Sequence, residues 1–104
     1  MDPTALVMQA LSSLPGATQG TSKVGNPQHT AWFVGGREFA HLHSDSMLDL
    51  RLPLAVQARL RGHALARFRS SRSQWLELTF CSPEEAQFVA SVAREAWAAA
   101  SRAK

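Results

Sequence analysis

Cysteine is nearly absent from this sequence, because Cys81 is the only one among 104 residues. The chain therefore has no intramolecular disulfide and no zinc site built on cysteines. It also has no apolar run near the ~20 residues that a membrane-spanning helix needs, and its beginning lacks the basic and apolar segments of a secretion signal. We therefore expect a cytoplasmic protein that does not interact with membranes.

Acidic residues are missing from one long stretch of the chain, between Arg51 and Gln74. This stretch holds six arginines, namely Arg51, Arg59, Arg61, Arg67, Arg69 and Arg72. The whole chain carries a net charge of +3, so the remainder carries −3. Guanidinium groups bind phosphate and carboxylate through two parallel hydrogen bonds. The stretch is therefore either a solvated basic surface or a surface that binds an anion or nucleic acid.

The residue pattern predicts a single α+β domain over residues 1–104. Hydrophobic residues make up 45% of the chain and charged residues 18%, which is typical of a folded domain with one core. Alternation of polar and apolar residues predicts strands at 31–34, 37–43, 47–52, 64–69 and 75–81. Helices are expected to begin at Pro3, Pro53 and Pro83, a residue type suited to the first helical turn. We expect a mostly antiparallel sheet of about five strands, packed on one face by helices that include a long C-terminal one.

The turn Gly35-Gly36 predicts a β-hairpin with a defined register. A two-residue turn places Trp32 directly opposite Phe39, and side chains alternate between the two faces of a sheet. One face is then expected to be packed by Phe33, Leu42, Leu48, Leu50, Phe68, Leu76, Leu78 and Phe80. The other face would collect aromatic, imidazole and charged groups: Trp32, Phe39, His41, His43, Asp49, Arg51, Arg67, Arg69, Trp75, Glu77 and Thr79.

This second face is the candidate functional surface. Its aromatic rings can stack on a planar ligand while its arginines bind an anion, and single-stranded nucleic acid offers both. We predict ligand contacts from Trp32, Phe39, Arg51, Arg67, Arg69 and Trp75. The same face could instead be half covered by the N-terminal helix, or it could form a homodimer interface.

His41 and His43 add a possible chemistry to this face, because residues two apart on a strand point the same way. The pair could bind a metal with Asp45 or Asp49 as a third ligand. Alternatively, one histidine oriented by Asp49 could act as a general acid or base, or both could be ordinary surface histidines. Because His-x-His is a weak pattern by itself, we predict no metal and no cofactor. If the protein is an enzyme, its catalytic residues are expected to be His41, His43 and Asp49.

The segments 36–43, 48–50 and 52–53, followed by Trp75 and a final amphipathic helix, resemble the luciferase-domain family of small bacterial proteins. The resemblance implies an α+β fold and a site at His41, His43 and Asp49. The family is named for a domain also found in fungal luciferases. This suggests, as an alternative to a binding module, a cofactor-free or metal-assisted small-molecule enzyme that is oxygenase- or isomerase-like. Light emission is not expected, since the fungal enzymes are longer and membrane-anchored. A second resemblance, in segments 14–18, 33–39 and 82–85, is to the YjbR-like α+β family, which has been discussed as DNA-binding.

Overall fold

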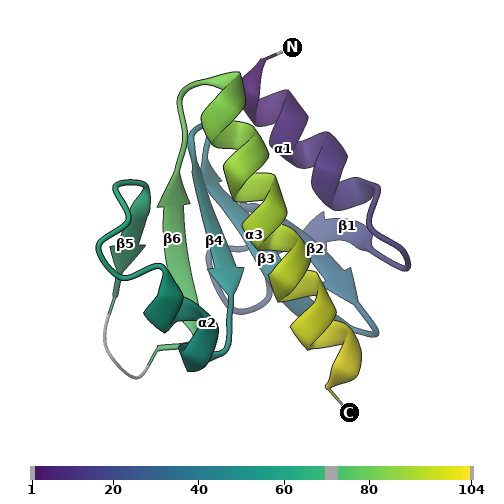
Figure 1. The fold of residues 1–104 in the computed structure, drawn as a ribbon. Coiled ribbons are helices and arrows are strands. Elements are labelled where there is room, and N and C mark those ends of the chain that lie inside the picture. The colour runs from purple at the N-terminus through teal and green to yellow at the C-terminus, as the bar shows by residue number, and fades with distance from the viewer. Residues whose placement is uncertain (1, 70–72, 104) are drawn as a thin grey trace.

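An antiparallel sheet of six strands and three helices make up the structure, a computed structural model that describes residues 2–69 and 73–103 (Figure 1). The helices are α1 (Pro3–Ser12), α2 (Leu54–Arg59) and α3 (Pro83–Arg102). The strands are β1 (Thr18–Thr21), β2 (Thr30–Val34), β3 (Arg37–Ser44), β4 (Met47–Arg51), β5 (Ala66–Phe68) and β6 (Trp75–Thr79). They lie in the order β1-β2-β3-β4-β6-β5. The predicted α+β class and long C-terminal helix are confirmed, and β1 is a sixth strand.

Helices α1 and α3 lie side by side on one face of the sheet (Figure 1). Both begin at a side-chain cap: an Asp2 carboxylate oxygen accepts a hydrogen bond from the Ala5 N–H, and the Ser82 hydroxyl accepts one from the Glu85 N–H. These caps satisfy backbone donors that a helix start leaves free. The short α2 lies at the end of the sheet near β5 and β6. Among the described residues, no helix is long and apolar enough to cross a membrane.

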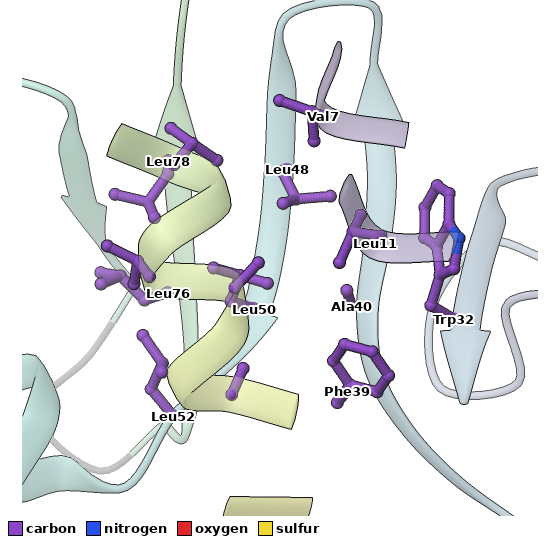
Figure 2. Packing of buried hydrophobic residues seen from close by; sticks show 14 of the residues in the cluster. Val7, Leu11, Trp32, Phe39, Ala40, Leu48, Leu50, Leu52, Leu76 and Leu78 are labelled. Carbon is purple, nitrogen blue, oxygen red and sulfur yellow. The ribbon is translucent and has the colours of Figure 1, made fainter. Parts of the chain in front are cut away.

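The core lies between the sheet and these two helices. Figure 2 shows Leu48 and Leu50 of β4 beside Leu76 and Leu78 of β6, with helical side chains packed against them. Trp32 belongs to the same cluster and is fully buried. Its indole Nε1 donates a hydrogen bond to the Ser12 hydroxyl at 3.0 Å, which satisfies the one polar atom of the ring.

A β-bulge in the hairpin changes which residues face the core. Trp32 pairs with Ala40 and Phe33 pairs with Glu38, so Phe39 is an extra residue without a partner in β2. A bulge lets two successive side chains share one face, and both Phe39 and Ala40 lie in the core (Figure 2). The predicted pairing of Trp32 with Phe39 is therefore wrong, and so is their place on the functional face.

The bulge also brings Glu38 and His41, on either side of Phe39 and Ala40, to the face of the sheet away from the core. Glu38 and His41 lie three residues apart, yet they share the face away from the helices and contact each other there. Phe33 pairs with Glu38 and is not part of the core cluster, so its predicted place in the packed layer is also wrong. The connection between β1 and β2, residues 22–29, passes behind the sheet in Figure 1 and contacts His41 on this second face.

Candidate functional site

Four alternating charges form a chain across the face of the sheet away from the helices. The Glu38 carboxylate oxygen Oε2 lies 2.9 Å from His41 Nδ1, and His41 Nε2 lies 2.9 Å from Asp49 Oδ2. Arg69 Nη2 donates a hydrogen bond to the same Asp49 oxygen at 2.9 Å. Pairing of β3 with β4 places His41 directly opposite Asp49. The side chains of Glu38, His41 and Asp49 are almost completely buried, whereas that of Arg69 is half exposed.

The two carboxylates favour the protonated form of His41. Burial by itself lowers the pKa of His41, but hydrogen bonds and Coulombic attraction to Asp49 and Glu38 outweigh it, so the net pKa is raised. Burial likewise raises the pKa of Asp49, but His41 and Arg69 outweigh burial and lower the net pKa of this carboxyl. Because each ring nitrogen of His41 lies 2.9 Å from a carboxylate oxygen, neither nitrogen is free to exchange a proton with a ligand.

Glu38 also anchors the segment that crosses this face. Burial by itself raises the pKa of Glu38. Hydrogen bonds from the Lys23 N–H and the Ser22 hydroxyl, together with His41, outweigh burial, so the net pKa is lowered. The Lys23 N–H donates to Oε1 at 2.6 Å and the Ser22 hydroxyl to Oε2 at 2.7 Å. Gly25 completes the turn by donating its N–H to the Ser22 hydroxyl at 2.8 Å. A Cβ atom at Gly25 would lie 3.3 Å from His41 Nε2, which is tighter than usual, so any larger residue here would press against the histidine.

A pocket of about 400 Å³ opens between this segment and the sheet. It is lined by Val24, Gly25, Asn26, His29, His41, His43, Asp49, Arg69, Ser73 and Trp75. Aromatic and imidazole rings form much of its wall: the His29 and His43 rings lie 5.1 Å apart, and the His41 and Trp75 rings 4.7 Å apart. The site is therefore concave, with flat rings and a guanidinium group at its surface.

The structure brings together five of the predicted site residues in this pocket: His41, His43, Asp49, Arg69 and Trp75. His43 is half exposed, and its Nδ1 lies 3.8 Å from Asp49 Oδ2. Two of the predicted aromatic contacts, Trp32 and Phe39, are buried on the helical side and cannot reach a ligand here.

Arg51 and Arg67 lie outside the pocket. Arg51 ends β4, donates its Nε–H to Gln74 Oε1 at 3.1 Å, and lines a separate pocket near α3. Arg67 is exposed on the edge strand β5, opposite Glu77 of β6. Arg72 lies outside the described residues. Among the described arginines of the basic stretch, only Arg69 lines the histidine pocket.

Sequence reasoning missed Glu38, Ser22 and His29. Strict alternation would put Glu38 on the face opposite His41, because the two residues are three apart, and the bulge at Phe39 brings them to the same face. Ser22 and His29 belong to a segment without periodicity, so no local pattern could place them.

Among the described residues, no group of three His, Cys, Asp or Glu side chains could hold a metal ion.

Comparison with known proteins identifies the family. Residues 36–96 match the family model described as the luciferase domain. This match covers more than half of the chain, and the chain belongs to the luciferase-domain family. No curated protein and no solved structure matches it. The first predicted resemblance is thus confirmed, whereas the comparisons do not show the resemblance to the YjbR-like family. The matched residues supply Glu38, His41, His43, Asp49 and Trp75, while the 22–29 segment precedes them.

Proposed function

We propose that the protein is a binding module whose pocket takes a small planar ligand with an anionic group. The observation that supports the proposal is the combination of flat rings and one half-exposed guanidinium group around a single cavity. At about 400 Å³ the cavity lies within the usual range for small-molecule sites, roughly 300–1,000 Å³.

The rings and the charge have distinct roles in this proposal. Trp75 contacts His41 on one side of the cavity, and His29 and His43 lie near each other. Flat apolar surfaces of this kind favour a planar ligand by stacking. The charges of Glu38 and Asp49 are balanced by His41 and Arg69, so the buried carboxylates do not leave the pocket strongly negative.

A small molecule fits the geometry better than a nucleic acid strand. A strand is bound by several stacked bases and a row of phosphate contacts. Here two of the three predicted stacking residues, Trp32 and Phe39, are in the core, and Arg51 and Arg67 lie away from the pocket. One planar group fits the cavity, and a single nucleotide is the largest nucleic-acid fragment that we expect it to accept.

The test is a binding titration followed by NMR chemical shifts, with 2-naphthoate, adenosine monophosphate and a single-stranded oligonucleotide as probes. We expect saturable binding of at least one small probe, with shifts at His43 and Trp75. Arg69→Gln should weaken this binding about tenfold or more, because it removes a charge-assisted contact. Arg67→Gln is the matched control and should bind normally.

Two outcomes would overturn the proposal. If no planar anion shifts the pocket resonances, the cavity is not a site of this class. If the oligonucleotide binds far more tightly than the mononucleotide, with a steep dependence on salt, the face is a nucleic-acid interface instead.

A specific observation also supports an acid–base enzyme. His43 is half exposed at the pocket, and Asp49 lies 3.8 Å from its Nδ1, so a small movement would form the hydrogen bond that orients an imidazole. His41 cannot have this role, because both of its nitrogens are paired with carboxylates. Solvent deuterium incorporation into planar ketones is the assay. We expect exchange with the wild type and its loss in His43→Gln, and no exchange with the wild type would refute this second candidate.

A further inference from the structure

A second pocket, of about 180 Å³, lies apart from the histidine site, where the start of β3 and the end of β4 meet the last turn of α3. Its lining is Arg37, Arg51, Leu52, Pro53, Gln74, Ala99, Ala100 and Ala103. The two pockets share no lining residue. This pocket is too small for a drug-sized molecule but large enough for a small organic acid.

The charged side chains of this lining are all positive among the described residues. Arg37 and Arg51 both contribute to it, and no acidic residue does so among the described residues. Arg51 uses its Nε–H for Gln74 Oε1, at 3.1 Å. Within residues 2–69 and 73–103, the Arg37 side chain makes no hydrogen bond or ion pair. Among the described residues, therefore, neither of the two guanidinium groups beside this cavity has a carboxylate partner.

Apart from the two arginines and Gln74, the lining is apolar. Five of the eight residues are Leu52, Pro53, Ala99, Ala100 and Ala103. The alanines are small and leave room against α3, while Leu52 is part of the core and Pro53 opens α2. A fully hydrated inorganic anion would gain little from such a wall. An acid with a short hydrocarbon chain would bury that chain and bring its head to the arginines.

We propose that this pocket binds a short-chain aliphatic monocarboxylate. The planar guanidinium groups match the geometry of a carboxylate, which accepts two parallel hydrogen bonds from one arginine. The apolar wall receives the chain. This site is independent of the ligand proposed for the histidine pocket. Arg51, which was predicted to bind a ligand on the sheet face, would instead bind an anion in this second pocket.

The experiment uses the full chain and an NMR titration with acetate, hexanoate and hexanamide. Hexanoate should bind with a dissociation constant on the order of millimolar, and its shifts should map to Arg37, Arg51, Ala99 and Ala100. Acetate should bind at least about fivefold more weakly, because it buries almost no chain. Hexanamide, which has the same shape without the charge, should not saturate the site.

Charge variants provide the control. Arg37→Gln and Arg51→Gln should each weaken hexanoate binding about tenfold, while Arg67→Gln, at an exposed position that lines neither pocket, should not change it. Equal binding of acetate and hexanoate would overturn the proposal, since it would show only general attraction of anions. Absence of binding, together with a loss of stability in Arg37→Gln, would also overturn it, because the arginines would then only complement the carboxyl end of α3.

Discussion

Replacing His41 by glutamine removes the cation between two buried carboxylates, and we expect it to destabilise the fold markedly. Loss of one partner from a buried ion pair typically costs about 3–5 kcal/mol. The lower end applies here, because Arg69 still pairs with Asp49, and Ser22 still donates to Glu38. We therefore expect the free energy of unfolding to fall by about 3 kcal/mol.

Thermal and urea denaturation measure this loss. For a domain of about 100 residues, 1 kcal/mol corresponds to a change in Tm of about 4–8 °C, so the variant should melt roughly 15 °C lower. His43→Gln is the matched control, since His43 is half exposed and its Nδ1 is 3.8 Å from the nearest carboxylate oxygen. Its expected loss is about 0.5 kcal/mol or less.

The wild-type pH profile tests the same reasoning without a mutation. Folding raises the pKa of His41 above its ordinary value of 6.5. The contribution of His41 to the free energy of unfolding is therefore complete below pH 6.5 and is lost as pH rises through the raised pKa. Folding lowers the pKa values of Glu38 and Asp49, so the contribution of these carboxylates to folding stability is present above their ordinary pKa values of 4.5 and 3.8. It is lost as pH falls through the lowered pKa values. Stability should therefore be greatest between about pH 5 and 6.5.

The reasoning is refuted if His41→Gln is as stable as the wild type. If that variant does not fold, the wild-type profile decides: unchanged stability between about pH 6 and 9 would show that His41 is not held as a cation. In a folded variant, the decline of stability above pH 6.5 should be smaller than in the wild type.

Two other substitutions separate the core from the candidate site. Trp32→Ala should reduce stability by about 3–5 kcal/mol in urea denaturation, as for a buried aromatic, whereas Trp75→Ala should reduce it less and weaken binding of planar probes. The reverse order would contradict the burial of Trp32. Gly25→Ala should disturb the turn at residues 22–25, because the new methyl group would lie 3.1 Å from Ser22 Oγ and 3.3 Å from His41 Nε2. Amide hydrogen exchange at residues 23–25 should then become faster, and unchanged exchange would show that the turn tolerates a side chain.

Most of the secondary structure follows from local patterns in the sequence. Asp2 and Ser82 cap the helices that follow them, and the alternation of Met47–Arg51 and Trp75–Thr79 predicts strands with one buried face. Gly35 and Gly36, with φ of 57° and 78°, adopt the left-handed conformations that a two-residue hairpin turn needs. These features depend on neighbours in sequence, so a local pattern is sufficient to find them.

The same local patterns placed part of the candidate site. His41, Asp49 and Trp75 were assigned to one face by alternation, and β3, β4 and β6 bring them together there. This assignment succeeded because β3 alternates regularly from Ala40 to His41 and pairs in register with β4 there. Trp32, Phe33 and Phe39 were placed on the wrong face, because the predicted hairpin register has no bulge.

The rest of the site depends on contacts between residues that are distant in sequence. An extra residue at Phe39 interrupts the pairing of β2 with β3, and the burial of Phe39 and Trp32 beneath helices distant in sequence favours this bulge. The bulge then places Glu38 beside His41, where it holds the turn that begins at Ser22. Side-chain alternation cannot foresee these contacts, because they depend on which face the helices cover and on where a segment without periodicity returns to the sheet.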